Sequence, residues 1–282
     1  MERDSLSPIG DMRYSKDILD DVRARIHVSD VVGRTVKLQK RGREHVGLSP
    51  FKQEKTPSFT VNDQKGFYHC FATGEHGDIF TFLMKVEGLS FTEAVERMAE
   101  QAGVTLPKPT ARDAAQEDHR TRLLAACEAA TAFFQTCLHE SDAPDAVAAR
   151  DYVAGRKLSR EAVSAFRLGY SPKDRQAMRS ALHRAGFTDA ELAGAGLIIS
   201  GEDISVPYDR FRGRLIFPIA DLRGQPIAFG GRILDRSHPA KYLNSPETPL
   251  FQKGRVLYNA HIARKAAHDS GAVIVGEGYM DV

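Results

Sequence analysis

Hydrophobic residues recur along the first hundred positions with two different periods. Between residues 17 and 32 the apolar side chains lie three or four positions apart, which predicts a helix that ends at Gly33. Short alternating stretches follow (TVKLQK, REHVGLS, SFTVN and GFYHCF), separated by Gly, Pro and Asn-Asp, and they predict a small antiparallel sheet. Another helix is predicted from the capping box of Ser90 and Glu93 to Gly103. Residues 1–104 therefore form a compact α+β module.

The pattern changes after this module. Residues 105–120 carry two prolines, many charges and no apolar period, so they are interpreted as a flexible linker. A second domain over residues 121–282 begins with helical periods and turns to strands after Gly196, including RLIFPIADLRGQPIAFGG with a hairpin turn at Arg223-Gly224. The apolar run Ala272–Val275 predicts a last strand. Helices are expected at 121–140, 146–156, after Ser159, at 173–185 and after Thr188.

The composition is that of a soluble globular protein of two domains, with 282 residues, 42% hydrophobic and 27% charged. Neither a membrane span nor a targeting leader is recognisable, so we expect a cytoplasmic protein with no membrane partner. The three cysteines are too few and scattered for a disulfide framework. Cys127 and Cys137 lie in an Ala/Phe/Leu-rich helical stretch and are interpreted as core residues.

Charge is segregated along the chain although the net charge is only +2. Residues 34–55 hold seven Lys or Arg and two Glu, residues 72–145 hold six basic and thirteen acidic side chains, and residues 207–265 hold eleven basic and four acidic ones. Two basic blocks thus flank an acidic one. Such blocks favour a polyanionic partner, nucleic acid or nucleotide phosphates, although a merely solvated basic face gives the same pattern.

Two carboxylates near the end of the chain suggest metal chemistry. Glu277 follows the apolar run directly, between Gly276 and Gly278, at the place where α/β sheets bind ligands. A helix beginning near Tyr279 would place Asp281 within one turn of Glu277, as a Mg²⁺ site on nucleotide phosphates requires. The spacing alone also fits a surface strand end with unrelated acids.

Longer phrases decide between these alternatives. The succession RFRGRLIFPIADLRGQPIAFGGRIL, KYLNSPETPLFQKG and EGYMDV resembles the RNA polymerase core of bacterial DnaG-type replicative DNA primases, and GLSPFKQEKTPSFTVNDQKGFYHCF resembles their template-reading domain. The resemblance implies that EGYMDV opens a Toprim fold whose metal-binding acids include Glu277 and Asp281, with Mg²⁺ or Mn²⁺ as cofactor. It also implies catalytic roles for Arg232, Lys241 and Lys253.

Further basic residues are expected to contact nucleic acid or nucleotide. Arg156 takes the place of a family arginine in YVAGRKLS. Arginine can clamp a phosphate with two hydrogen bonds, and lysine acts as a point charge beside it. The complete set expected to bind nucleic acid or nucleotide is Arg156, Arg210, Arg212, Arg214, Arg34, Lys37, Lys40, Arg41, Arg43, Lys55, Lys65 and Tyr68, the last by base stacking.

The resemblance also exposes a degenerate zinc site. The family pattern is Cys-x-x-His followed by Cys-x-x-Cys, and the four positions here are Ser49, Lys52, Cys70 and Thr73. Only one of the four ligands remains, Cys70, and the Lys52 ammonium would repel a cation, so we predict no zinc there. Substitute ligands from His45, His69 and His76 beside Cys70 are an open alternative. Phe51, Phe59, Phe67 and Phe71 are expected to pack in place of the metal.

The chain is interpreted as a DNA primase, an RNA polymerase that makes short primers on single-stranded DNA from NTPs. The expected fold class is α+β: a small zinc-ribbon-like antiparallel sheet domain, a linker, and a mixed α/β core cut off at its first Toprim strand. The resemblance implies further acids and a helicase-binding domain beyond Val282, so we expect an inactive, monomeric fragment whose replicative-helicase contact is missing. Alternatives are a non-enzymatic single-strand-binding module and another Toprim enzyme, a topoisomerase or nuclease.

Overall fold

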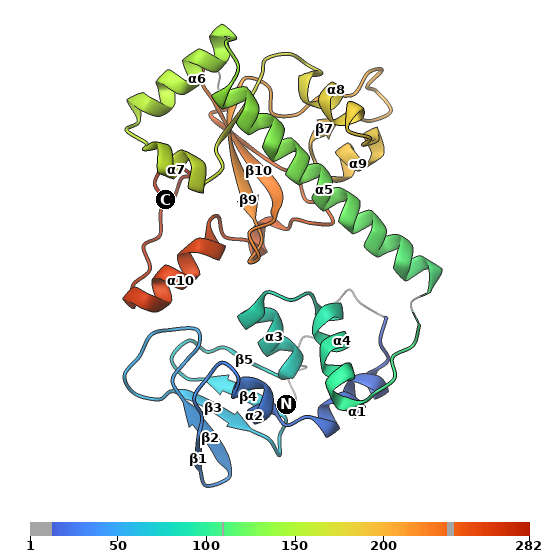
Figure 1. Ribbon diagram of the computed structural model, residues 1–282, viewed down its shortest axis with the longest axis vertical. Coiled ribbons are helices and arrows are strands. Elements are labelled where there is room, and N and C mark those ends of the chain that lie inside the picture. The colour runs from blue at the N-terminus through green and yellow to red at the C-terminus, as the bar shows by residue number, and fades with distance from the viewer. Residues whose placement is uncertain (1–12, 109, 236–239) are drawn as a thin grey trace. The chain divides into compact units, whose positions relative to one another are not determined.

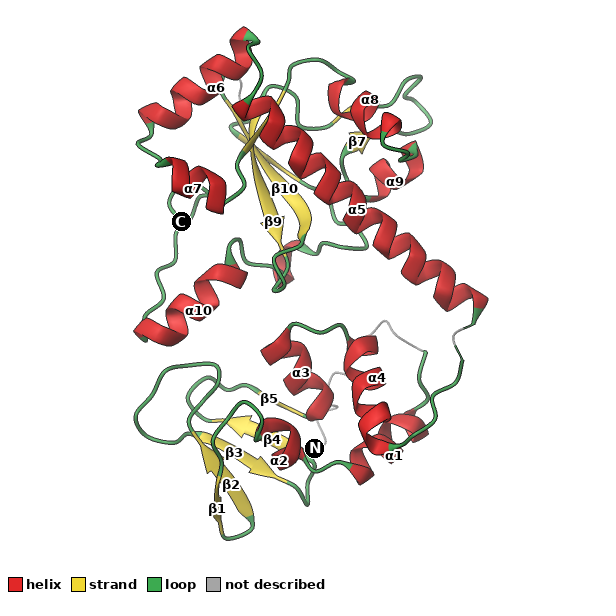
Figure 2. Cartoon of the chain, viewed as in Figure 1, coloured by secondary structure: helices red, strands yellow, loops and turns green. Residues whose placement is uncertain are grey.

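The computed structural model describes residues 13–108, 110–235 and 240–282. These residues fall into two compact units, the first made of residues up to 113 with 264–273, the second of residues 114–263 with 274–282 (Figure 1). Both units combine helices with antiparallel sheets (Figure 2), which confirms the predicted α+β class. The domain boundaries predicted from the sequence stay a prediction.

A five-stranded antiparallel sheet in the order β1-β2-β3-β4-β5 forms one layer of the first unit. The predicted alternating stretches all contribute to it, which confirms the small sheet. Helix α3 was not predicted: Asp78 caps it by accepting the Thr81 N–H at 2.9 Å. The elements are α1 (Lys16–Arg25), α2 (Val28–Val32), β1 (Gln39–Arg41), β2 (Glu44–Gly47), β3 (Phe59–Asn62), β4 (Phe67–Cys70), β5 (His76–Gly77), α3 (Ile79–Glu87) and α4 (Phe91–Ala102).

The core of this unit is aromatic. Phe59 and Tyr68 stack across β3 and β4 with ring centroids 5.3 Å apart, and Phe82 of α3 packs edge-on against Tyr68 at 5.4 Å. Tyr68 is fully buried, so the prediction that it stacks on template bases is wrong. The strand alternates, so Phe67 and Phe71 face outward instead, and their predicted packing role is wrong as well.

The second unit is built on a four-stranded sheet in the order β11-β10-β9-β6. The β9–β10 pair is the predicted hairpin, with Arg223 and Gly224 in its turn. Helix α5 crosses this sheet (Figure 1) and buries Phe134 against Phe229. The elements are α5 (Ala111–His139), α6 (Pro144–Gly155), α7 (Arg160–Ala165), β6 (Gly169–Ser171), α8 (Ala177–Arg184), α9 (Asp189–Gly194), β7 (Ile198–Ile199), β8 (Tyr208–Asp209), β9 (Arg214–Ala220), β10 (Pro226–Ile233), β11 (Tyr242–Asn244), the 3-10 turn η1 (Lys253–Arg255) and α10 (Ala260–Ser270).

The predicted linker is wrong for residues 111–120, because α5 already begins at Ala111. The missed signal is a capping pair: Thr110 Oγ1 accepts the Asp113 N–H, and the Asp113 carboxylate accepts the Thr110 N–H at 2.9 Å. Charged residues without an apolar stripe form the first turns of this helix. Its buried stripe begins at Leu123, and Cys127 is fully buried there as predicted.

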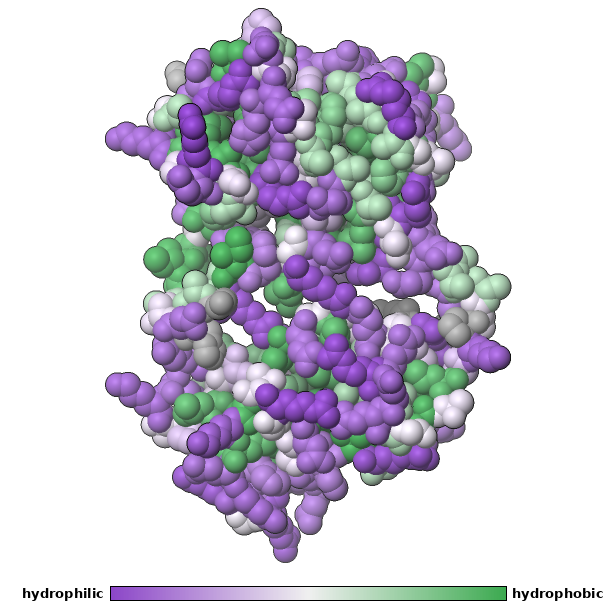
Figure 3. Space-filling model, viewed as in Figure 1, coloured by the Kyte–Doolittle hydropathy of each residue, from purple (hydrophilic) through white to green (hydrophobic). Residues whose placement is uncertain are grey.

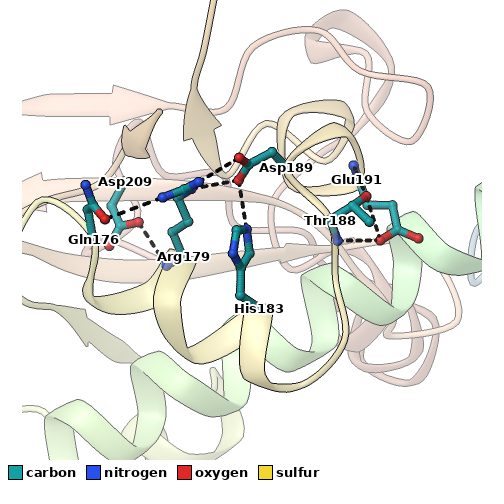
Figure 4. Close-up of polar contacts among 7 residues, drawn as sticks. All are labelled: Gln176, Arg179, His183, Thr188, Asp189, Glu191 and Asp209. Atoms are coloured by element: carbon teal, nitrogen blue, oxygen red, sulfur yellow. Dashed lines mark hydrogen bonds and ion pairs between the residues drawn. The ribbon is translucent and has the colours of Figure 1, made fainter. Parts of the chain in front are cut away.

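Polar contacts hold the small helices of the second unit together (Figure 4). Asp209 accepts the backbone N–H groups of Met178 and Arg179 at the start of α8, at 2.8 and 3.0 Å. Burial raises the pKa of Asp209 to about 6, against the lowering effect of these two hydrogen bonds. Arg179 in turn forms a two-pronged ion pair with Asp189 at the start of α9.

The end of the chain differs from the prediction. Residues 272–275 form no strand, and Val273, Ile274 and Val275 are exposed. A helix does not begin near Tyr279 either; residues 279–281 form a turn closed by a hydrogen bond from the Asp281 N–H to the Gly278 carbonyl at 2.9 Å. Apolar runs pair as strands only when neighbouring strands accept their backbone hydrogen bonds, and no strand among the described residues pairs with this run.

The visible surface is mostly hydrophilic, with hydrophobic patches on both units (Figure 3). Across the described residues, none of the helices combines the length and apolar character that crossing a membrane requires.

Candidate functional site

Tyr279 fixes the EGYMDV segment onto the sheet of the second unit. Its ring stacks on Phe217 of β9 with centroids 5.2 Å apart, and its hydroxyl donates to Asn244 Oδ1 of β11 at 2.9 Å. Burial raises the pKa of Tyr279, so this hydroxyl keeps its proton and stays a donor. The ring also lies over Gly230, where a Cβ would approach its carbon atoms to 2.5 Å. The FGGR and EGYMDV phrases therefore meet in space.

Aromatic rings also hold Arg232, one of the predicted catalytic residues. Arg232 lies at the end of β10, and its Nη1 donates to the Tyr242 hydroxyl at 3.0 Å. Its guanidinium carbon lies 5.1 Å from the centre of the Tyr152 ring and 5.5 Å from that of Tyr242. The Tyr242 ring is 6.1 Å from the Tyr279 ring. A cation held between two aromatic rings keeps a fixed position and can still donate to a phosphate.

The two predicted carboxylates lie within the turn that Tyr279 anchors. Glu277 and Asp281 are both exposed, and Asp281 Oδ2 accepts the Gly278 N–H at 3.1 Å. The turn is tight, since a Cβ on Gly276 would lie 3.1 Å from the Asp281 Cβ. Two accessible carboxylates on a tight turn are oxygen donors of the kind that Mg²⁺ prefers. The described residues hold no group of three or more metal-ligating side chains, so these acids form only part of a site.

The remaining basic residues differ in exposure. Lys241, Lys253 and Arg156 are exposed, so their charges are available to an anion. Lys241 adjoins Tyr242 at the start of β11, and Tyr242 is the register partner of Arg232. Lys253 begins η1, where its backbone N–H donates to Glu247 Oε1 at 3.1 Å.

Arg214 does not extend the basic surface as predicted. It is only 6% exposed, and its Nη1 donates to the carbonyl oxygens of Gly231 and Lys241 at 3.3 Å. Burial, and then the nearby Arg212, lower the pKa of Arg214. This guanidinium therefore holds the β10–β11 edge together. Arg210 also donates to a carbonyl, that of Asn244, at 3.1 Å, while Arg212 lies over the Tyr208 ring at 4.6 Å.

Three of the four positions of the family's zinc ligands, Ser49, Cys70 and Thr73, still lie together in the first unit. The Cys70 thiol donates to Ser49 Oγ at 3.2 Å, and Ser49 Oγ also accepts the Phe51 N–H at 3.0 Å. Burial alone would raise the pKa of Cys70, but hydrogen bonds with Ser49 and Thr73 and with the backbone of residues 72 and 73 outweigh it and lower the pKa. Hydroxyl groups and an exposed lysine are not zinc donors, so this set does not fit a tetrahedral zinc ion.

The three histidines do not assemble around Cys70. His45 lies beside Asp63, with 3.6 Å between Nδ1 and the carboxylate. His69 packs against Phe71 at 4.4 Å and lies 6.0 Å from the His76 ring, centre to centre. His76 Nδ1 is 3.0 Å from the Gly74 carbonyl oxygen. The residues described here contain no cluster of three or more possible metal ligands, and the prediction of an empty zinc site stays a prediction.

One face of the first sheet carries exposed aromatic and basic groups. Strand registers place Arg41 of β1 and Phe67 of β4 on the same face, and His69 lies next to Phe67 on that face. Phe71, just beyond β4, is 71% exposed. We call Arg41, Phe67, His69 and Phe71 the aromatic face. The sequence analysis assigned base stacking to Tyr68 instead. The alternation in GFYHCF fits equally well with Tyr68 exposed or with Phe67, His69 and Phe71 exposed. All seven predicted basic residues of this unit are exposed: Arg34, Lys37, Lys40, Arg41, Arg43, Lys55 and Lys65.

In comparisons with known proteins, two protein families match successive parts of the chain. Residues 14–114 match the CHC2 zinc finger family, and residues 133–264 match the N-terminal domain of the DNA primase catalytic core. The zinc-finger match therefore persists although three of the four ligand positions have changed. The structure is similar to that of the zinc-binding and RNA polymerase domains of the Aquifex aeolicus primase, with 29% identity and a TM-score of 0.51 over 95% of this chain and 62% of that one.

Curated relatives named DNA primase cover nearly the whole sequence. The protein from Halalkalibacterium halodurans is 38% identical over 96% of this chain, and that from Salmonella typhimurium is 41% identical over 96%. The chain spans 45% and 46% of the lengths of these two relatives. With its CHC2 zinc-finger domain and the N-terminal domain of the catalytic core, the chain belongs to the family of bacterial DnaG-type DNA primases.

Proposed function

We propose that this chain takes part in RNA primer synthesis, as the template-binding domain and N-terminal core of a DNA-dependent RNA polymerase. In the reaction, a 3′-hydroxyl oxygen attacks the α-phosphorus of an NTP, the bond to the β-phosphate oxygen breaks, and pyrophosphate leaves as the hydroxyl proton is lost. The observation that carries the proposal is the contact of Tyr279 with Gly230 and Asn244, which joins the acidic turn to the strands next to Arg232 and Lys241.

Each group has a role that follows from its place. Arg232 donates to phosphate oxygens while Tyr152 and Tyr242 hold its guanidinium, and Lys241 adds an exposed charge at the start of the neighbouring strand β11. Glu277 and Asp281 supply oxygen donors for Mg²⁺ or Mn²⁺. When bound, such an ion neutralises charge that develops on the transferred phosphate. Lys253 and Arg156 are proposed to guide the triphosphate or template by charge alone.

The aromatic face is proposed to grip single-stranded template. Exposed rings stack on bases without regard to sequence, and the nearby basic side chains neutralise the phosphates. Phe71 is the most exposed ring of this face, and Lys65 lies 6.0 Å from the Phe67 ring centre. Single-stranded DNA and NTPs are thus the proposed partners, and the contact with a replicative helicase remains an expectation from the family.

Two assays on the purified protein test the proposal. We expect a single-stranded oligonucleotide to bind with an affinity that falls as salt rises, and an NTP with Mg²⁺ to bind in a calorimetric titration, whereas the two acids, as only part of a metal site, should yield no RNA. A matched pair of variants localises the effect: Arg232→Ala removes the held cation, and Arg160→Ala removes an exposed arginine from α7 that lies outside the predicted set. NTP affinity lost only in Arg232→Ala supports the assignment; equal NTP affinity of both variants contradicts it.

A second candidate function is single-strand binding without catalysis. It is favoured because the described residues contain no group of three or more possible metal ligands. Salt-sensitive DNA binding without any binding of an NTP would support this module. RNA product of any length would rule it out. Absence of binding to single-stranded DNA would contradict both proposals.

A further inference from the structure

The sheet of the second unit fixes the main chain of Arg232, but its long side chain is placed by other contacts. Strand β10 pairs with β9, where Arg232 is opposite Leu215, and with β11, where it is opposite Tyr242. The guanidinium donates to the Tyr242 hydroxyl, and among the described residues no carboxylate pairs with it. An arginine side chain without an acidic partner samples several rotamers unless packing restricts it.

The Tyr152 ring on helix α6 supplies this restriction from outside the sheet. The guanidinium carbon of Arg232 is 5.1 Å from the centre of this ring, closer than the 5.5 Å to that of Tyr242. Tyr152 is itself held in place, because it packs against the buried cluster that contains Leu215 and Phe217 of β9. A ring face attracts a guanidinium electrostatically at this distance. The position of Arg232 therefore depends on a residue from a separate element.

The hydroxyl of Tyr152 takes no part in this contact. It is buried and has no hydrogen-bond partner among the described residues. Buried tyrosine hydroxyls usually have a partner, and one left unpaired costs free energy. The chain thus keeps an aromatic ring on Arg232 although the hydroxyl of that ring gains nothing from the protein. The ring face is the part of Tyr152 to which a function can be assigned.

Helix α6 carries a second arginine close to Tyr152. Arg156 follows Tyr152 by one helical turn, and its backbone N–H donates to the Tyr152 carbonyl oxygen at 3.1 Å. Side chains four positions apart lie on the same face of a helix. Arg156 is exposed, so its charge is available to an anion. The Tyr152 ring therefore joins an arginine of α6 to an arginine of β10, and two guanidinium groups can share the charges of adjacent phosphates.

We propose that Tyr152 is a positioning residue of the nucleotide site, whose ring fixes the Arg232 guanidinium so that Arg232 and Arg156 act on the same triphosphate. This inference rests on the proposed function, which assigns Arg232 to phosphate binding. A side chain that is ordered before its ligand arrives loses less conformational entropy on binding. Removal of the ring therefore weakens binding of the triphosphate without the loss of any contact between Tyr152 and the ligand. The effect of Tyr152 exists only while Arg232 is present.

Calorimetric titration tests the inference with two probes, ATP with Mg²⁺ and inorganic triphosphate, which lacks the nucleoside. Tyr152→Leu removes the ring and should weaken binding of both probes about threefold to tenfold, the effect of one cation–π contact. Tyr152→Phe removes only the unpaired hydroxyl and should bind both probes like the parent protein. Phe187→Leu is the matched control: it removes a ring that lies 4.6 Å from the Arg122 guanidinium carbon, but Arg122 already donates to Glu191. This control should leave both affinities unchanged.

A double-mutant cycle separates positioning from a merely structural role. In a protein that already carries Arg232→Ala, the further change Tyr152→Leu should alter ATP affinity by less than about twofold, because the group through which the ring acts is gone. A general loosening of the site would instead lower the affinity by the same factor with and without Arg232. Thermal melts establish that each variant is folded before its affinity is compared.

The outcomes distinguish this inference from the proposed function. The inference alone is overturned if Arg232→Ala weakens ATP binding but Tyr152→Leu does not, or if the effects of the two substitutions add. It is also overturned if Tyr152→Phe loses as much affinity as Tyr152→Leu, since the hydroxyl would then be the acting group. If Arg232→Ala binds ATP as tightly as the parent protein, the proposed function and this inference fail together.

Discussion

Rebuilding the zinc site tests how the first unit is held together. The perturbation is the triple substitution Ser49→Cys, Lys52→His and Thr73→Cys, which restores the family's ligand pattern around Cys70. In the present structure Cys70 Sγ lies 3.2 Å from Ser49 Oγ. Two thiolates on a tetrahedral zinc ion are about 3.8 Å apart, given Zn–S bonds of about 2.3 Å. The separation of this pair would have to grow by only about 0.6 Å, so these two positions are nearly preformed.

The expected gain in stability follows from mass action. With free zinc at about 1,000 times its Kd, binding adds about 4.1 kcal/mol to the free energy of unfolding. Loss of the hydrogen bond between Cys70 and Ser49 removes about 1 kcal/mol of this. The net gain of about 3 kcal/mol corresponds to a rise in Tm on the order of 10 to 20 °C for a unit of this size.

Elemental mass spectrometry gives the zinc content, and thermal melts with and without EDTA give the change in Tm. We expect about one zinc per triple variant and less than about half an equivalent in the parent protein. Adding Cys70→Ala to the triple variant is the control and should remove most of the gain. A folded triple variant that binds no zinc would refute the prediction that the four restored ligands can reach one ion, and zinc in the parent protein would refute the predicted absence.

Three further predictions concern other parts of the chain. Gly230→Ala should displace Tyr279 and destabilise the second unit by about 1 to 3 kcal/mol, measured by urea unfolding. Gly201→Ala is the control and should not destabilise it, because a Cβ there meets open space. Equal stability of the two variants would contradict the described packing of Tyr279 on Gly230. Phe71→Ala should weaken single-stranded DNA binding about tenfold in a gel shift with little change in Tm, whereas Leu48→Ala, also exposed in the first unit, should leave binding unchanged. Arg179 and then His183 lower the pKa of Asp189 to about 2, so its stabilising effect is complete above its unfolded pKa of 3.8 and disappears as pH falls toward 2. Because Asp189 is 37% exposed, Asp189→Asn should cost only about 1 kcal/mol at pH 7, measured by urea unfolding, and the difference should vanish near pH 2; a difference that persists there would contradict the ion-pair explanation.

Much of the local structure could be predicted because its signals are short-range. The capping boxes at Ser90 and Thr188 begin the helices that they predicted, since the side chain and backbone groups involved lie within four residues. The turn at Gly224 likewise depends on its own φ of 83°. The resemblance to DnaG-type primases rested on uninterrupted phrases, which the comparisons confirm.

Where a sequence pattern fits two arrangements, only the tertiary structure decides which side chains face the core. The alternating aromatics of GFYHCF fit either face of a strand, and only the pairing with β3 and the approach of Phe82 put Tyr68 inside and Phe67 outside. In the sequence, Arg214 is one of three closely spaced arginines and is expected at the surface. In the structure it is buried because its guanidinium donates to the carbonyl oxygens of Gly231 and Lys241. Such outcomes depend on contacts between residues far apart in the chain, so no local pattern of polar and apolar positions contains them.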